Sequence, residues 1–494
     1  HTTSPAMREL MRRIFLTQAV PPEGNVEDGG FIASRLELLA GMGNVEAVRE
    51  LLAVTPGRGT NERLIRTETD IHLLLGDFIH ACALAGGTDR GTTTEYWQKV
   101  TIFCEVLSGA HAKAQLGLSL LREIGVEDSM YFLMLESMMA SEVPIIEDMS
   151  SMSPLNIGIL RASRTRLNLD AETPLSPAIL AAIAGNPDLE MSERLVAAER
   201  AASTGVLSTE DLRALYDSAS FDAETIANPL SAVDSLAGAD ARALLYQVVS
   251  SQTVDGAKAE AALLALETAQ SADLYAITAQ VFSGVIKQVP PRTDLIWFAS
   301  HAVRALVIVG DIEAATGWLD MLRVNATLSD EAARSLALLV PVVQLTGLDD
   351  DHLFGPMVSV DVWREAQKNM PDSRDRAILY YSLLEGLGHP VNPAVWDDLG
   401  YGGDAIMIDS GVDGQAADLA LNLPDPVLWH RLFGAARSGI TGETVLLALA
   451  TLGEQGTAKS HPLTISRVVQ SLAVVGLEAE ARALAVEAAL AGGL

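Results

Sequence analysis

Asp349, Asp350, Asp351 and His352 stand together in the stretch LDDDHLFG, and all four offer donor atoms that suit a divalent cation. A calcium-binding loop needs donors at alternating positions and a closing glutamate, and this stretch lacks that pattern. We therefore interpret these residues as solvated acids near helix ends. The sequence predicts no metal site and no cofactor.

A second candidate is the glycine-rich stretch GYGGDAIMIDSGVDG, which contains Tyr401 and Asp404. It is neither a phosphate-binding loop nor a dinucleotide fingerprint, because the lysine and the preceding strand are missing. The segment 398–415 is too long for a simple turn, and we expect a surface loop that contributes to partner binding. Its portion GDAIMIDSG is compatible with one small β-hairpin.

Methionine and tryptophan side chains provide the remaining candidates for binding. Met130, Met134 and Met138 recur at helical spacing, and such stripes serve either as core packing or as adaptable binding surfaces. Trp363 and Trp396 in the C-terminal third are core anchors or interface anchors. Both interpretations stay open for these five residues.

Catalysis has no recognisable signature in this chain. The histidines are scattered, and no arrangement of nucleophile, base and acid can be argued from the sequence. The two cysteines, Cys82 and Cys104, have no histidine partners at the spacing of a zinc site. They are either buried free thiols or a disulfide, and a disulfide implies an oxidising compartment.

The composition indicates a helical protein of several domains or one long repeat. The chain has 494 residues, of which 49% are hydrophobic but only 5% aromatic, so its apolar material is mainly Ala, Leu, Val and Ile. Alanine and leucine are strong helix formers, and we predict an all-α fold. The net charge of −30 argues against nucleic acid and anionic membrane surfaces as partners. We expect no transmembrane helix, because no run of 18 uncharged apolar residues occurs.

A glycine turn recurs along the chain. Gly43, Gly76 and Gly109 are 33 residues apart, and so are Gly205 and Gly238. In each case we expect an apolar helix to end at a left-handed glycine, followed by a second helix. A small residue five positions after the glycine lets the two helices approach closely. It is a valine or an alanine after six glycines, at positions 48, 81, 114, 243, 315 and 481, which follow Gly43, Gly76, Gly109, Gly238, Gly310 and Gly476.

Gly310, Asp311, Glu313 and Ala315 form a Gly-Asp-x-Glu-x-Ala turn that resembles the turn of a tetratricopeptide repeat. The likeness covers about half of the chain in degenerate form. It implies an α-solenoid, a right-handed stack of antiparallel helix hairpins. We divide the chain into an N-terminal repeat arm (1–143), an elbow (144–156), central repeats (157–345) and a C-terminal helical region with irregular loops (346–494).

Three stretches resemble a group of long, uncharacterised envelope proteins of Gram-negative bacteria. They are EYWQKVTIFCEVLSG (95–109), SPLNIGILRAS (153–163) and ERLVAAERAASTGVLSTEDLRALY (193–216). The resemblance implies no particular activity. It favours a periplasmic location over a cytoplasmic one and implies that Cys82 pairs with Cys104. The chain begins with His1 rather than Met, so we expect processing or trimming there, and export stays open.

The expected function is that of a non-enzymatic scaffold or adaptor that binds another protein on a helical-repeat surface. The concave surface made by the helices that precede each glycine turn is the expected binding face. The alternative is a helical-toroid enzyme acting on envelope glycans, which needs paired carboxylates in a cleft flanked by aromatic rings. A third hypothesis, a carrier of small hydrophobic ligands, needs an enclosed apolar cavity.

Overall fold

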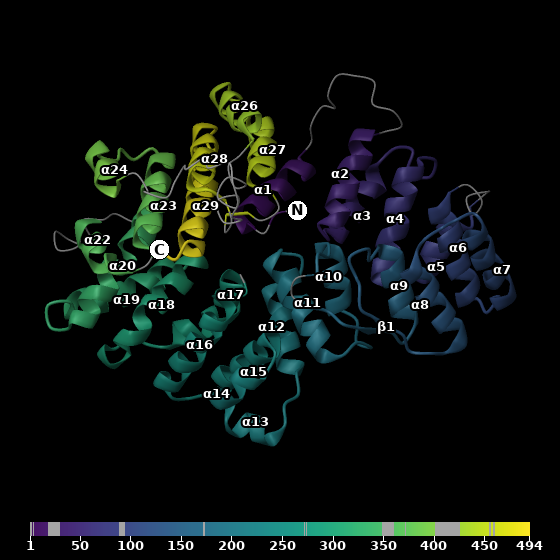
Figure 1. Ribbon diagram of the computed structural model, residues 1–494, viewed down its shortest axis with the longest axis horizontal. Helices are drawn as coiled ribbons and strands as arrows, with labels where there is room; N and C mark the ends of the chain where they lie inside the picture. Colours follow the sequence, from purple (N-terminus) through teal and green to yellow (C-terminus); the bar gives the residue numbers. More distant parts are fainter. Residues whose placement is uncertain are drawn as a thin grey trace, which may run out of the picture. The chain divides into compact units, whose positions relative to one another are not determined.

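The computed structural model describes residues 2, 4–17, 30–87, 94–170, 173–270, 272, 274–347, 360–370, 372–400, 425–453, 456–457 and 460–494. Of these residues 74% are helical, and two short strands are the only β-structure among them, which confirms the all-α prediction. Most of the predicted loop at 398–415, including the expected β-hairpin, lies outside the described residues. Figure 1 shows the order of the elements.

The chain forms two compact units. The N-terminal unit is Phe15–Leu215, and the C-terminal unit combines His1–Ile14 with Tyr216–Leu494. Residues 144–156, predicted as an elbow, lie within the N-terminal unit.

The N-terminal unit is built from short helices and one pair of strands. Its helices are α2 (Gly30–Gly41), α3 (Val45–Val54), α4 (Glu62–Leu75), α5 (Phe78–Ala85), α6 (Glu95–Leu107), α7 (His111–Glu123), α8 (Ser129–Ala140), α9 (Pro154–Ala162), α10 (Pro177–Ala184) and α11 (Met191–Ser203). The strands β1 (Ile145–Ile146) and β2 (Arg166–Leu167) pair in parallel, with Ile145 opposite Arg166. The division between the units falls within α1 (Pro5–Leu16) and α12 (Thr209–Ser218).

The C-terminal unit contains helices and no strand among its described residues. Its elements are α13 (Ala223–Ala227), α14 (Pro229–Ala232), the 3₁₀ helix η3 (Val233–Ser235), α15 (Gly238–Ser251), α16 (Asp255–Gln270), α17 (Tyr275–Gln288), η4 (Thr293–Leu295), α18 (Ile296–Ile308), α19 (Ile312–Asn325), α20 (Asp330–Leu345), α22 (Val360–Gln367), α23 (Ser373–Gly386), α24 (Pro393–Leu399), α26 (Pro426–Arg437), α27 (Thr441–Leu452), α28 (Pro462–Val474) and α29 (Glu478–Ala491).

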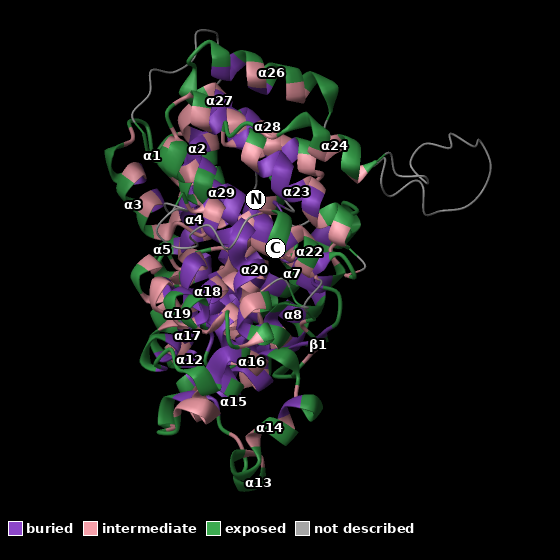
Figure 2. Cartoon of the chain, turned by 90° about the vertical axis from the view of Figure 1, so that its left-hand side faces the viewer, coloured by how far each residue is buried: buried purple, intermediate pink, exposed green. Residues whose placement is uncertain are grey.

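Helices that follow one another in the chain pack together, as α4 packs with α5, α6 with α7 and α28 with α29. Packing also joins helices that are distant in the chain: α4 contacts α9, and α23 contacts α28. Many helices carry buried residues on one side and exposed residues on the other (Figure 2). Each unit therefore has a core assembled from several amphipathic helices.

The glycine turns form as predicted at most of the positions. Gly43, Gly76, Gly109 and Gly310 all have φ between 75° and 78°, the left-handed conformation that favours glycine. After Gly310, the side chain of Asp311 accepts a hydrogen bond from the Ala314 amide and caps the next helix. The six small residues predicted five positions after the glycines are all buried.

Gly238 does not follow this pattern. It is the first residue of α15 rather than the cap of a preceding helix, and its φ is not positive. The cause is local: η3 ends at Ser235 and Leu236 is extended, so no α-helix reaches the expected turn.

The core of the N-terminal unit begins with an apolar cluster from α2, α3 and α4. Its members are Ala33, Leu36, Leu39, Val48, Leu52, Leu64 and Ile71. Trp97, Phe103 and Tyr131 are the bulkiest buried side chains of the unit and come from α6 and α8. Among the described residues, no helix is long and apolar enough to cross a membrane.

Candidate functional site

An open pocket of about 450 Å³ lies in the N-terminal unit, between helices that each precede a turn. Residues from α4, α6 and the start of α8 line it, together with Ser151 and residues 153–156 at the beginning of α9. These three helices lead into Gly76, Gly109 and Ser141, which all have positive φ. Two of these helices, α4 and α6, precede glycine turns of the predicted kind, whereas α8 ends at Ser141.

Local capping fixes the helix ends that surround the pocket. Asp128 is the N-cap of α8, and its Oδ1 accepts a hydrogen bond of 3.0 Å from the Tyr131 amide. Ser153 caps α9 in a capping box with Asn156, and Pro154 occupies the first turn of that helix. Short-range sequence signals thus determine where α8 and α9 begin, beside the pocket.

The charged residues of the pocket follow the 33-residue period of the glycine turns. Glu62, Glu95 and Asp128 are 33 residues apart, and so are Arg66 and Lys99. All five residues line the pocket. Acidic residues are favoured at helix N-termini in any protein, which accounts for the first set by itself. That preference does not account for the two cations four residues later.

Asp70 and Tyr96 form the central polar contact of the pocket. The Tyr96 hydroxyl donates a hydrogen bond of 2.7 Å to Asp70 Oδ1, and the Arg66 guanidinium lies 4.3 Å from the centre of the Tyr96 ring. Burial raises the pKa of Asp70 to about 6, although the Tyr96 hydrogen bond and the Arg66 charge oppose the rise. Burial also raises the pKa of the Tyr96 hydroxyl, and the Asp70 charge adds to that rise. Asp70 can therefore gain or lose a proton near neutral pH.

Lys99 joins α6 to α8. Its Nζ lies 2.8 Å from Asp128 Oδ2 and 2.5 Å from Glu95 Oε1. Burial alone would lower the pKa of Lys99, but hydrogen bonds with these two carboxylates raise it above its ordinary value. The Tyr131 hydroxyl donates to the Lys99 carbonyl at 2.9 Å.

Carboxylates outnumber cations in this pocket. Glu62, Asp70, Glu95 and Asp128 face only Arg66 and Lys99 as charged residues of opposite sign. Two aromatic rings, those of Tyr96 and Tyr131, also line it. The arrangement suits a polar group that carries positive charge, because such a group meets an excess of carboxylates.

The methionines predicted for partner binding lie on α8 beside this site. Met130 and Met134 are buried, and Met138 is partly buried. The Asn156 amide lies 4.0 Å from the Met134 sulfur as a weak donor. None of the three methionines lines the pocket, which α8 reaches instead through Asp128 and Tyr131.

The other predicted binding residues belong to the C-terminal unit. Trp363 is buried, with its ring 5.0 Å from that of Tyr380. Trp396 is partly buried, and its Nε1 donates to Glu385 Oε1 at 3.2 Å. Tyr401 and Asp404 lie outside the described residues.

Cys82 of α5 and Cys104 of α6 are joined in a disulfide, with their Cα atoms 5.7 Å apart. The two helices pack directly against each other. The bond thus links the second helix of one glycine-turn pair to the first helix of the next pair, and α6 is the helix that carries Tyr96 and Lys99.

The charged residues of the pocket were not singled out in the sequence. The signal that could have found them is the 33-residue period itself, applied to charged positions as well as to glycines. Asp70 has no such signal, because it lies on α4 and meets Tyr96 of α6 only in the folded unit.

Comparison of the chain with protein-family models, curated proteins and solved structures found no match.

Proposed function

We propose that this chain is a non-enzymatic scaffold of tetratricopeptide-like helix hairpins that binds another protein. The binding face is the pocket lined by α4, α6 and α8, and the bound segment carries a lysine or arginine side chain. The repeated placement of Glu62, Glu95 and Asp128 with Arg66 and Lys99 is the observation that carries the proposal. Repeat proteins bind through side chains at equivalent positions of successive units.

The charge balance supports a basic segment. The four carboxylates of the pocket exceed its two cations, and the whole chain has a net charge of −30. Such a field attracts a basic partner at long range and weakens as salt screens it. The Tyr96 ring already accepts a guanidinium from Arg66, so the aromatic part of the site has the geometry for cation–π contact.

We further propose that the protein works in an oxidising compartment, the periplasm of a Gram-negative cell. The disulfide between Cys82 and Cys104 supports this location, because cytoplasmic thiol systems keep such pairs reduced.

The binding face can be located by photo-cross-linking in cells. A photoreactive amino acid at Ser151, an exposed residue of the pocket rim, should cross-link to a partner protein. The same group at Glu210, whose side chain is 80% exposed outside the pocket, serves as the control and should give no such product. A partner cross-linked from position 210 and not from position 151 would contradict the proposal.

A glycan-cleaving enzyme is the second candidate, and Asp70 is the observation that favours it. A carboxyl with a pKa of about 6 suits a general acid, and the tyrosine rings of the pocket offer surfaces for a sugar. An enzyme of this kind would release sugar from envelope glycans and lose that activity in Asp70→Asn. A binding protein shows no turnover in either form.

A further inference from the structure

Two histidines and an aspartate converge at the turn between α4 and α5. His72 stands in the last turn of α4, Asp77 is the N-cap of α5, and His80 follows in the first turn of α5. The turn between them closes through two backbone hydrogen bonds, from the Gly76 amide to the Leu73 carbonyl and from the Asp77 amide to the His72 carbonyl. This helix-ending motif with a left-handed glycine brings α5 back beside the end of α4.

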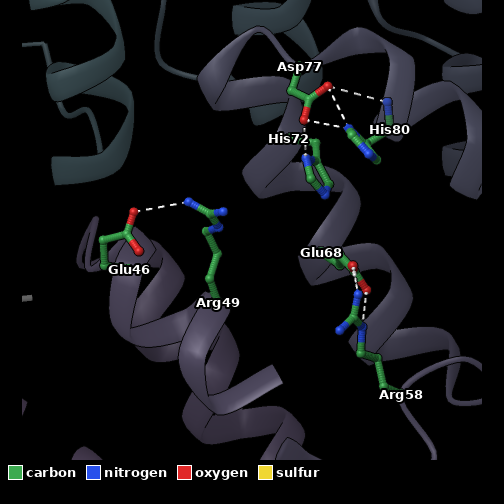
Figure 3. Close-up of polar contacts among 7 residues, drawn as sticks. All are labelled: Glu46, Arg49, Arg58, Glu68, His72, Asp77 and His80. Atoms are coloured by element: carbon green, nitrogen blue, oxygen red, sulfur yellow. Dashed lines mark hydrogen bonds and ion pairs between the residues drawn. The ribbon is translucent and has the colours of Figure 1, made fainter. Parts of the chain in front are cut away.

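Both imidazoles direct the same ring nitrogen at one carboxylate. His72 Nδ1 lies 3.0 Å from Asp77 Oδ2, and His80 Nδ1 lies 2.8 Å from the same oxygen (Figure 3). The two rings are stacked, with their centres 5.1 Å apart and their planes 20° apart. One donor atom from each of the three residues fits within 4.8 Å of the others.

Helix capping explains only part of this arrangement. The cap needs one oxygen of Asp77, which accepts from the His80 amide at 3.4 Å. It does not require either imidazole to point at the carboxylate. Without a cation, each Nδ1 must carry a proton to bond with Asp77, and a bound metal ion would replace both protons.

We propose that His72, Asp77 and His80 bind a divalent transition-metal ion of the zinc class. Two imidazole nitrogens and one carboxylate oxygen form a donor set typical of such ions, whereas Mg²⁺ and Ca²⁺ prefer oxygen donors. A tetrahedral zinc ion with bonds of about 2.1 Å holds its ligand atoms roughly 3.4 Å apart. The two distances from the imidazole nitrogens to Asp77 Oδ2, 3.0 and 2.8 Å, therefore need to lengthen by only about half an ångström. The His80 side chain is 69% exposed, which leaves solvent access for a further ligand.

The surrounding structure holds the three ligands in place before an ion binds. Cys82 lies two residues after His80 on α5 and is bonded to Cys104 of α6. The helix that carries Asp77 and His80 is therefore fixed on one side by the glycine turn and on the other by a covalent link. Preorganised ligands of this kind lower the cost of binding. The site is separate from the pocket residues, none of which belongs to this set.

Isothermal titration calorimetry of Zn²⁺ into the full, untagged chain tests this inference. The wild-type protein should bind one Zn²⁺, with a matching rise in Tm, and should bind Mg²⁺ and Ca²⁺ at least tenfold more weakly. His72→Gln and His80→Gln should each weaken zinc binding by at least tenfold. Loss of a residue that only hydrogen-bonds to a metal ligand already costs ten- to hundredfold in affinity, and these histidines are the ligands themselves. Asp77→Asn should also weaken binding, although asparagine keeps the helix cap.

The matched control is His111→Gln, which removes an exposed histidine from the same unit and should leave zinc affinity unchanged. Circular dichroism of each metal-free variant checks that the helices are retained, and exposed His80 is the position where substitution disturbs the fold least. Co²⁺ offers a second readout, because its visible absorption should appear in the wild type and disappear in His80→Gln. The inference is overturned if the wild type binds no Zn²⁺, or if its affinity survives in both His72→Gln and His80→Gln.

Discussion

Asp70 is the residue of the pocket whose protonation the structure changes most clearly. Burial raises its pKa from 3.8 to about 6, so the folded state holds this proton more tightly than the unfolded chain does. A group of this kind stabilises the fold fully below about pH 4, and that contribution is lost as the pH rises through 6. At about 1.4 kcal/mol per pKa unit, the whole effect is at most about 3 kcal/mol.

We therefore predict a pH-dependent difference in stability between the wild type and Asp70→Asn. Asparagine keeps an oxygen for the Tyr96 hydroxyl but cannot ionise, so the Tm of the wild type relative to the variant should fall between pH 4 and pH 7. Differential scanning calorimetry measures this. Burial raises the pKa of Glu487 in the C-terminal unit to about 7, but that pH dependence is present in both proteins and cancels.

Asp188→Asn is the control for this comparison, since Asp188 is an exposed aspartate of the same unit. Its Tm difference from the wild type should stay nearly constant over the same range. If the Asp70→Asn difference is equally flat, Asp70 ionises freely in the folded protein and the pocket is more open to water than its geometry indicates.

Residue-level chemistry was the hardest part to predict from the sequence. The set His72, Asp77 and His80 has the spacing H-x₄-D-x₂-H, which matches no familiar ligand pattern. Its members come together only because Gly76 adopts a left-handed conformation and reverses the chain. The same holds for Asp70 and Tyr96, 26 positions apart, which lie on different helices and meet only in the folded unit.

Individual helices and turns were much more predictable. The glycine positions and the buried small residues that follow them are local signals, and both appear in the structure. Gly238 shows the limit of this rule, because the same glycine pattern begins a helix when no helix precedes it. The contact of α5 with α6 could not be predicted from the sequence pattern of one hairpin, because it joins one helix pair to the next.

The link between α5 and α6 gives a prediction at the scale of elements. Protein purified from its native compartment and denatured without reductant should show no free thiol, because Cys82 and Cys104 are bonded. The bond joins residues 22 positions apart, so reduction should lower the free energy of unfolding by about 3 kcal/mol in the chain-entropy estimate.

A double variant, Cys82→Ser with Cys104→Ser, controls for the reductant itself and should unfold identically with and without it. Finding two titratable thiols in the native protein would remove the main support for a periplasmic location.

At the scale of the whole molecule, the all-α fold followed directly from composition, because an Ala- and Leu-rich chain with few aromatic residues favours helices. The long-range packing did not follow. Contacts such as α4 with α9 and α23 with α28 join helices separated by many residues, and no local period encodes them. The net charge of −30, which comes from the excess of acidic residues, is also a property of the whole molecule, and it favours a basic partner.

The central claim is that the repeated acids of the pocket capture a basic partner protein. The most direct measurement compares partners retained from a native envelope extract by the wild type and by the variant Glu62→Gln, Glu95→Gln, Asp128→Asn. These changes preserve the hydrogen bond from Trp97 Nε1 to residue 62 and the cap of α8.

The matched variant Glu46→Gln, Glu210→Gln, Asp375→Asn removes the same charge from side chains that are 78%, 80% and 82% exposed and lie outside the pocket. We predict that the wild type and the matched variant retain the same basic protein, and that the retained amount falls as salt rises. The pocket variant should retain at most one-tenth of that amount, which corresponds to a loss of about 1.4 kcal/mol in binding free energy. Undiminished retention by the pocket variant, or no protein retained by the wild type, would contradict the claim.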